Sequence, residues 1–268
     1  MREDRGPGIP FVIPPFDTED LAARFEAGFP LEFCACESFD PDLILDLASS
    51  GFIPMAAEAA QGRDLLLPKL HLERCLLDPA LVHVSRTVRS RLRGYSLAVD
   101  TAFPEVVAAC VATHGDSWLR PPLVAAFLIL HARGVASGVA RRARLLSFEL
   151  YEGASLVAGE FGALVGSCYT SWSGFRRIDG SGTVQLVALA RAFERACVGI
   201  WDLGMALDYK LSLGGSCVSR PVFLARFREA RARACLPDFG FLPLGVSELV
   251  DRGYLPPEAK SRQPTEGP

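Results

Sequence analysis

The clearest pattern of hydrophobic and polar positions lies between residues 156 and 205. Residues 156–166 and 167–175 are rich in Val, Leu, Tyr and Trp, which is typical of strands, and the Gly166-Ser167 pair between them suits a tight hairpin turn. From residue 183 to residue 197 the apolar positions recur at helical spacing, with Ser181 as a candidate cap before the helix and Gly199 as a left-handed cap after it. The pattern therefore predicts a strand hairpin, a loop and a helix in that order.

A carboxylate interrupts the next apolar run. Residues 200–205 are Ile-Trp-Asp-Leu-Gly-Met, which predicts a short buried strand that contains Asp202. Burying an unpaired carboxylate is costly, so an acid in such a strand needs a partner or a role. Asp202 is therefore a candidate site residue.

The loop before the predicted helix is rich in glycine. Arg177, Gly180, Ser181 and Gly182 lie in the sequence RIDGSG, next to a helix start where free backbone N–H groups and the helix dipole favour an anion. The loop and the order of the elements around it resemble the acyl-donor cleft of GNAT acyltransferases, which hold pyrophosphate on an R-x-x-G-x-G loop. A flexible capping loop is the alternative interpretation of the same residues.

The stretch at residues 78–94 combines an apolar stripe with basic residues. Asp78 opens it, and Val84, Val88 and Leu92 recur every four residues, which predicts one helix. The other faces of this helix carry four arginines without an acid between them: Arg86, Arg89, Arg91 and Arg93. Such a surface is either an ordinary solvated face or a site for a phosphate backbone.

The remaining pattern divides the chain into three parts. Two helices are predicted near the N-terminus, one at residues 17–27 and one within 39–55 that begins after Asp40 and ends at Gly51. They indicate a small N-terminal α/β domain at residues 1–70, and a strand and turn are predicted at 65–74, across its end. Strands at 95–100 and 147–151 and helices at 103–113, 123–132 and 219–235 join the central stretch in a second domain at residues 71–236. We expect a C-terminal tail at residues 237–268, disordered at its end. The predicted fold class is α/β, of the α+β kind, with a mixed, mostly antiparallel central sheet flanked by helices.

Composition narrows the class of protein. A chain of 268 residues with 50% hydrophobic content can bury a full core, and its net charge of −3 neither favours nor excludes nucleic acid as a partner. The first residues, MREDRGPGIPFVIPPF, lack the apolar run of a secretion signal, and the most apolar predicted helix is too short to span a bilayer. Eight cysteines without a C-x-x-C pair indicate reduced thiols rather than a metal site. We expect a cytoplasmic protein without membrane contact.

Several segments in a fixed order resemble one enzyme family. Arg74 with DPALVHVSR, then DSWL, SFELYEGASLVAGEFGALVG, IWDLG and KLSLGG are similar to the leucyl/phenylalanyl-tRNA-protein transferase family, whose members have roughly LHISR, GTWI, HSIEVW with LVGGxYG, LIDCQ and ASLGA at these points. The resemblance implies a small N-terminal domain joined to a GNAT-like aminoacyltransferase domain. It also implies transfer of Leu, Phe or Met from aminoacyl-tRNA to the α-amino group of an acceptor protein that begins with Lys or Arg, which marks that protein for degradation. On this basis we expect a monomer that needs no cofactor and no metal.

The resemblance also assigns roles to individual residues. Trp118 matches the tryptophan of the family's pocket for the apolar side chain. Asp202 matches a strand-end aspartate that the family uses near the amine, so it is the expected catalytic residue. The tRNA-facing basic cluster is expected at Arg74, Arg86, Arg89, Arg91 and Arg93.

The chain departs from the family where the amine would bind. The family has Gly-Glu-Ser after its hairpin, whereas this chain has Ser171-Trp172-Ser173, so Trp172 replaces the glutamate and Ser173 is retained. Gly204 replaces the glutamine of LIDCQ. An indole cannot take a proton and a glycine offers only backbone, so the acceptor stays open, with Trp172, Ser173 and Gly204 as expected parts of the substrate pocket.

Three functions are therefore open. The first is an aminoacyltransferase that takes its aminoacyl group from tRNA. The second is a CoA-dependent N-acyltransferase that holds pyrophosphate on the loop, an alternative favoured by Gly180 and Gly182, which the family pattern lacks. The third is a non-catalytic module that binds tRNA or a degradation substrate, favoured by the two replaced site residues.

Overall fold

A computed structural model of the chain describes residues 9–59, 62–82, 84–115, 117–134, 143–233 and 237–251. Most of its strands form one eight-stranded sheet in the order β10-β4-β5-β6-β7-β8-β3-β9. Strands β7 and β8 pair in parallel, and the other neighbours are antiparallel, which confirms the predicted mixed, mostly antiparallel sheet. The strands are β3 (Glu73–Leu77), β4 (Tyr95–Val99), β5 (Arg144–Glu152), β6 (Ser155–Val165), β7 (Cys168–Arg176), β8 (Ile200–Asp202), β9 (Ser216–Ser219) and β10 (Leu244–Gly245).

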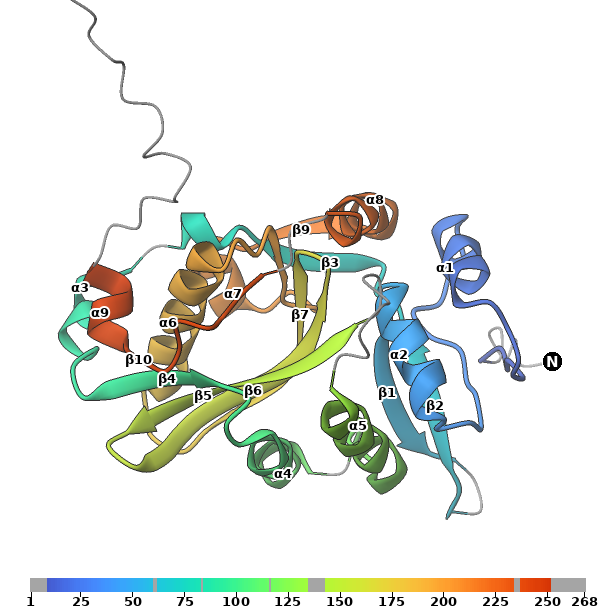
Figure 1. Cartoon of the computed structure of the whole chain (residues 1–268). Helices are drawn as coiled ribbons and strands as arrows, with labels where there is room; N and C mark the ends of the chain where they lie inside the picture. The colour runs from blue at the N-terminus through green and yellow to red at the C-terminus, as the bar shows by residue number, and fades with distance from the viewer. Residues whose placement is uncertain are drawn as a thin grey trace, which may run out of the picture.

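Helices cover both faces of this sheet (Figure 1). Helices α4 (Phe103–His114) and α5 (Pro121–Arg133) pack on one face, and α6 (Ser181–Arg195) with α9 (Val246–Asp251) packs on the other. Strand alternation directs neighbouring aromatic residues to opposite faces: Phe161 of β6 meets Phe103 of α4 at 5.8 Å between ring centroids, whereas Phe148 of β5 meets Phe193 of α6 at 5.2 Å. The sheet therefore separates two hydrophobic cores.

The central hairpin and the helix after it form as predicted. Strands β6 and β7 pair from Val165–Cys168 at the turn to Ala158–Arg176, with a bulge after Phe161. The turn residue Gly166 has a φ of +56°, which glycine adopts without strain. Helix α6 leads back to β8, whose last residue is Asp202.

The ends of α6 differ from the prediction. The residue before the helix is Gly180, with a φ of +81°, and Ser181 is the first helical residue, buried with its Oγ donating to the carbonyl of Ile178 at 2.6 Å. After the helix, Cys197 takes the left-handed conformation with a φ of +62°, although Gly199 was the expected position. The predicted caps at Ser181 and Gly199 are therefore wrong.

The N-terminal elements form a second, smaller layer (Figure 1). Helices α1 (Thr18–Glu26) and α2 (Pro41–Ser49) begin at the predicted caps Asp17 and Asp40, whose carboxylates accept from backbone N–H groups of the first turns. Strands β1 (Ile53–Glu58) and β2 (Asp64–Lys69) form a separate two-stranded sheet. Helix α2 contacts α5 and α1 contacts α8 (Arg220–Arg231), so these elements pack onto the large sheet's helices, and a domain boundary at residue 70 stays a prediction.

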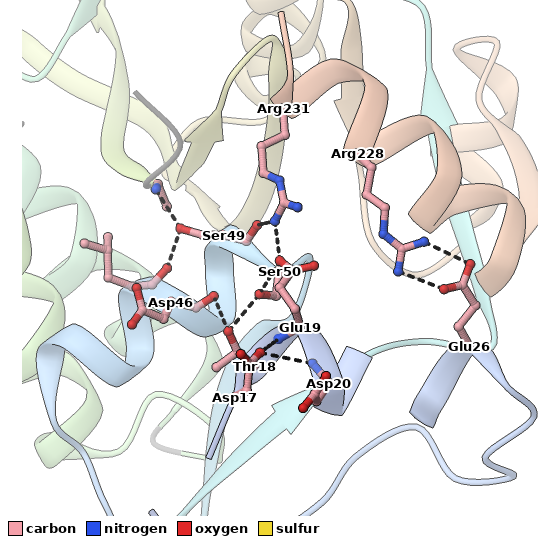
Figure 2. A network of polar contacts seen from close by, with 12 residues as sticks. Asp17, Thr18, Glu19, Asp20, Glu26, Asp46, Ser49, Ser50, Arg228 and Arg231 are labelled. Carbon is pink, nitrogen blue, oxygen red and sulfur yellow. Dashed lines mark hydrogen bonds and ion pairs between the residues drawn. The ribbon is translucent and has the colours of Figure 1, made fainter. Parts of the chain in front are cut away.

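Polar contacts join α1 and α2 to helix α8 (Figure 2), and Arg231 donates to the carbonyl of Ser49 in α2 at 2.7 Å. Both oxygens of Glu26 accept from Arg228, at 3.1 and 2.8 Å. Glu19 accepts from Arg231 and also from the hydroxyl of Ser50, the latter at 2.8 Å. These contacts hold the N-terminal elements against a helix that lies far away in the sequence.

The stretch at residues 78–94 is not the single helix that the apolar spacing predicted. It contains a 3-10 turn, η2 (Pro79–Leu81), and a short helix, α3 (Arg86–Ser90). Asp78 caps the backbone N–H of Ala80 at 3.0 Å and Ser85 caps that of Val88 at 3.3 Å, so each piece has its own start. The extended backbone at Val82 separates them.

Further elements lie where the pattern gave no signal. Helix α7 (Asp208–Ser212) follows β8, and β10 with α9 places residues 244–251 of the expected tail on β4 and α6. Residues 252–268 of that tail, and residues 135–142 between α5 and β5, lie outside the described residues. Of the helices that the structure does describe, none has the length and apolar character to cross a membrane.

The described cysteines are free thiols. Cys34, Cys36, Cys75, Cys110 and Cys168 are buried, and Cys197 and Cys217 are exposed. Burial raises the pKa of the Cys110 thiol to about 12, so this side chain behaves as a small apolar core residue.

Candidate functional site

A cavity of about 700 Å³ opens between the N-terminal elements and the large sheet. Strand β1 contributes Ile53 and Met55, the loop before α5 contributes Trp118, and β6 and β7 contribute Glu160 and Trp172. The start of α6 and the segment from β8 to α7 complete the walls with Gly182, Thr183, Gln185, Leu186, Leu203, Gly204, Met205, Leu207, Tyr209 and Lys210. The cavity therefore combines apolar walls with a few polar groups, as binding sites for small organic groups do.

Glu160 is the carboxyl group of this cavity. It is 6% exposed, and burial raises its pKa to about 7, because the charged form is poorly solvated there. The hydroxyl of Ser171 donates to its Oε1 at 2.7 Å, and the indole N–H of Trp201 donates to the same hydroxyl oxygen at 2.8 Å. The carboxyl group is thus held in place and titrates near neutral pH, as a general base must.

Sequence reasoning missed Glu160, although a signal was present. It lies in an 11-residue strand whose residues after the first are all buried, where an acid is as costly as it is in β8. The cost of burying a carboxylate, which made Asp202 a candidate, is the same for Glu160. In the β6–β7 hairpin, Glu160 pairs with Gly174 of β7, the strand that also contains Trp172.

Trp118 and Trp172 both line the cavity, as expected for pocket walls. Trp172 also packs against Phe127 of α5 at 4.9 Å between ring centroids, and it makes an edge contact with Phe161 at 6.2 Å. Ser173 and Gly204 line the same cavity. Four of the residues expected at the substrate pocket therefore meet at one place.

Asp202 lies behind the cavity wall rather than in it. Its side chain is fully buried and makes an ion pair with Arg74, with Nη2 3.1 Å from Oδ2. Thr170 donates to Oδ2 at 3.0 Å, and the backbone N–H of Gly204 donates to Oδ1 at 2.9 Å. Its oxygens are occupied and it is not among the residues lining the cavity, so the structure does not bring Asp202 to the expected place beside the amine, and its catalytic role stays a prediction. Asp202 instead positions the backbone of the cavity wall at Gly204.

Arg74 does not lie on the surface, where the sequence analysis expected it as part of a tRNA-facing basic cluster. Its guanidinium is fully buried, lies 4.3 Å from the centroid of the Phe223 ring and donates to the carbonyl of Gly51 at 2.9 Å. A buried cation between an acid and an aromatic ring is out of reach of a phosphate in this structure. Arg74 therefore does not belong to a tRNA-facing surface.

The other predicted basic residues do lie on the surface. Arg86, Arg89, Arg91 and Arg93 are all exposed, and among the described residues none of them forms an ion pair. Arg91 also reaches the glycine-rich loop, since a Cβ placed on Gly180 would lie 2.4 Å from its Nη1. Glycine at this position therefore allows a basic side chain to approach the start of α6.

The glycine-rich loop is only partly turned toward the cavity. Gly182 lines it, whereas the guanidinium of Arg177 donates to the carbonyl of Leu156 at 2.7 Å and lies 5.2 Å from the Phe175 ring centroid. The hydroxyl of Ser181 is buried and satisfied locally. Of the four loop residues, glycine backbone rather than side chains faces the cavity.

Two donors beside the cavity have no hydrogen-bond partner among the described residues. They are the side-chain amide Nε2 of Gln185 and the indole Nε1 of Trp172. Both residues line the cavity, and Gln185 is 4% exposed. Buried donors without a partner are costly, so these two atoms are weak points in the packing of the cavity wall.

Comparisons with known proteins agree with the segments quoted from the sequence. The family model described as leucyl/phenylalanyl-tRNA protein transferase matches residues 76–228. A leucyl/phenylalanyl-tRNA–protein transferase of Thiobacillus denitrificans is 34% identical over 161 residues, which cover 58% of this chain and 67% of that protein. One of Azoarcus sp. is 32% identical over 157 residues, 57% of this chain and 63% of that protein. One of Rhizorhabdus wittichii is 31% identical over 195 residues, 70% of this chain and 74% of that protein. The matched segments thus span about two thirds of these relatives.

Proposed function

The chain belongs to the leucyl/phenylalanyl-tRNA–protein transferase family, and on that premise we propose that it moves an aminoacyl group from aminoacyl-tRNA to the N-terminal α-amino group of an acceptor protein. Leu, Phe or Met is the proposed aminoacyl group. That the product is marked for degradation, and that the protein acts as a monomer in the cytoplasm, belong to the same proposal.

The observation that carries the proposal is the placement of Glu160. Its carboxyl group lies in the cavity with a pKa raised to about 7, so at neutral pH a large fraction is ready to accept a proton. The nitrogen of the acceptor amine attacks the ester carbonyl of aminoacyl-tRNA and gives a proton to Glu160. The C–N bond forms, the ester C–O bond breaks, and Glu160 returns the proton to the ribose oxygen that leaves on tRNA.

The apolar wall supports an apolar aminoacyl group. Ile53, Met55, Trp118 and Trp172 lie on the cavity surface and offer aliphatic and aromatic contacts. Burying the side chain of Leu, Phe or Met against such a wall stabilises a complex by roughly 1.5–3 kcal/mol. Trp172, at the position where the resemblance suggests a glutamate, adds aromatic surface to this wall.

The exposed arginines support tRNA as the donor. Arg86, Arg89, Arg91 and Arg93 are exposed on α3 and just after it, and Arg91 reaches Gly180 beside the start of α6. Lysines and arginines that neutralise phosphates supply most of the affinity of proteins for nucleic acid. A tRNA bound on this surface could place its charged end in the cavity.

A CoA-dependent acyltransferase is the second candidate, and one observation favours it. Helix α6 follows Gly180 without a side-chain cap and without an acid in its first turn, and Gly182 lines the cavity. Free N–H groups of that kind can bind a phosphate. Calorimetric titration with acetyl-CoA tests this candidate, because the tRNA proposal expects no heat of binding.

The main experiment measures transfer of labelled Leu, Phe or Met from charged tRNA to a panel of peptides that differ only in their first residue. The E160Q variant is expected to transfer at least about 100-fold more slowly, as loss of a general base does. The exposed variant R24Q on α1 serves as the control with normal transfer. Equal transfer by E160Q would remove Glu160 from the reaction, and tRNA binding without transfer to any peptide would favour the non-catalytic alternative.

A further inference from the structure

On the premise of the proposed function, we infer that the cavity selects acceptors whose first side chain is an acid, Asp or Glu, and that Lys210 is the residue that binds this carboxylate. The resemblance to the family would imply the opposite, an acceptor that begins with Lys or Arg. Three features of the cavity carry the inference.

The first feature is the position of Lys210. Its Nζ donates to the carbonyl of Leu203 at 2.6 Å and to that of Met205 at 3.0 Å. Two accepting carbonyls favour the protonated ammonium, which has three N–H donors, so one donor remains for a ligand. Lys210 lines the cavity together with Glu160, and the two groups influence each other electrostatically.

The second feature is the balance of charge on the cavity wall. Among the described lining residues, Glu160 alone carries a carboxyl group, whereas Lys69, Arg176 and Lys210 carry cationic groups. Lys69 is neutralised by Glu32, with Nζ 3.4 Å from Oε2. Arg176 is exposed, so Lys210 is the partly buried lining cation that makes no ion pair with a carboxylate among the described residues. Asp202, which also acts on the charge of Lys210, is paired with Arg74.

The neighbouring ionisable groups do not reverse this balance. Glu32 is also shared with His71, at 3.4 Å, and accepts from the backbone N–H of Leu72 at 3.0 Å. Burial lowers the pKa of His71 to about 4, so its ring is neutral at physiological pH. His114 makes a hydrogen bond between Nε2 and the carbonyl of Gly174 at 2.8 Å. Among the described residues, the cavity therefore has no second acid free to receive a cationic acceptor side chain.

The third feature is that the reaction requires Glu160 for proton transfer, which leaves Lys210 as the charged group for the acceptor side chain. Glu160 must handle the proton of the α-amine, so it is not available to pair with a Lys or Arg side chain. A cationic side chain would also lie in the same cavity as Lys210, which repels it. An acidic side chain gains a charge-assisted hydrogen bond from Lys210 instead.

The test compares peptides that are identical after a first residue of Glu, Asp, Ala, Arg or Lys, with labelled aminoacyl-tRNA as donor. We expect the wild-type kcat/KM to be at least about tenfold higher for Glu and Asp than for Arg and Lys, the difference that one charge-assisted hydrogen bond gives. K210M should bring the ratio close to one, K210E should reverse it, and K210R should keep it. R24E makes the same charge change outside the cavity and should leave the ratio unchanged.

Binding of the same peptides, measured by fluorescence anisotropy, separates this inference from the proposed function. Absence of transfer to every peptide would refute the proposed function, while a Glu-over-Arg binding preference that K210E reverses would still support the acidic subsite. A wild-type preference for Arg or Lys would overturn the inference. The same conclusion would follow if folded K210M and K210E kept the wild-type ratio.

Discussion

Arg74 and Asp202 form an ion pair in which neither side chain is exposed, with Nη2 3.1 Å from Oδ2. The pair joins β3 to β8 at the edge of the cavity, and Arg74 also reaches Gly51 at the end of α2. Through the N–H of Gly204, Asp202 supports the cavity wall. The two charges are therefore part of the framework that holds the site.

Removing the charge of Asp202 should destabilise the fold. In D202N the buried guanidinium of Arg74 loses its counter-ion, so the free energy of unfolding should fall by about 3–5 kcal/mol in urea denaturation. The matched control is E37Q, since Glu37 pairs with Arg63 at 3.1 Å on the surface, and it should cost no more than about 1 kcal/mol. If D202N keeps wild-type stability but transfers no aminoacyl group, Asp202 takes part in the reaction itself.

The pH dependence of transfer should report Glu160. Because burial raises its pKa to about 7, kcat/KM should rise as the pH increases through that value and the carboxylate forms. The acceptor amine titrates close by, so the profile of E160Q with the same peptide gives the contribution of the amine alone. Identical profiles for wild type and E160Q would exclude Glu160 as the base.

The same pKa shift predicts a change of stability with pH. The folded pKa of about 7 lies above the ordinary value of 4.5, so the folded state holds a proton that the unfolded state loses. The stability from this group is full below about pH 4.5 and is lost as the pH rises to about 7. In urea titrations, E160Q should lose less stability than wild type over this range, by up to about 3 kcal/mol. If the free energies of unfolding of wild type and E160Q change with pH in parallel, the pKa of Glu160 is not raised.

Removing surface arginines should change the salt dependence of tRNA binding. In R86Q/R89Q, the slope of the logarithm of the binding constant against that of salt concentration should decrease by roughly 0.7–0.9 for each phosphate that the protein no longer neutralises. The double variant R24Q/R63Q removes two exposed arginines of the N-terminal elements and should keep the wild-type slope. If both double variants bind tRNA with the wild-type slope, the basic surface is an ordinary solvated face.

Two turn glycines provide a test of the close approach between β6–β7 and α8. Gly153 and Gly166 have φ values of +60° and +56°, but a Cβ on Gly166 would lie 2.3 Å from the carbonyl oxygen of Ala230, while Gly153 faces open space. Alanine at Gly153 should cost about 1 kcal/mol from backbone strain. G166A should cost about 1–3 kcal/mol more, because backbone must move to make room. Equal melting temperatures for the two variants would contradict this packing.

Local signals in the sequence were enough for many of the elements. Asp17 and Asp40 cap α1 and α2 as predicted, and the β6–β7 hairpin, α6 and β8 follow in the predicted order. Each of these depends on neighbouring residues: a side-chain cap, a turn glycine or a periodic apolar stripe. The prediction of one helix over residues 78–94 was wrong, because Asp78 and Ser85 each cap a separate short element within the apolar stripe.

The sequence by itself determined the α+β class, the order of the central elements and the family, because these follow from local periodicity and from motifs in fixed order. Only the tertiary structure decided which acid faces the cavity. Asp202 and Glu160 are both acids in buried strands, yet pairing with Arg74 takes one out of the cavity while the other lines it. That difference depends on contacts between residues far apart in the chain, and no local pattern encodes burial or partnership at such distances.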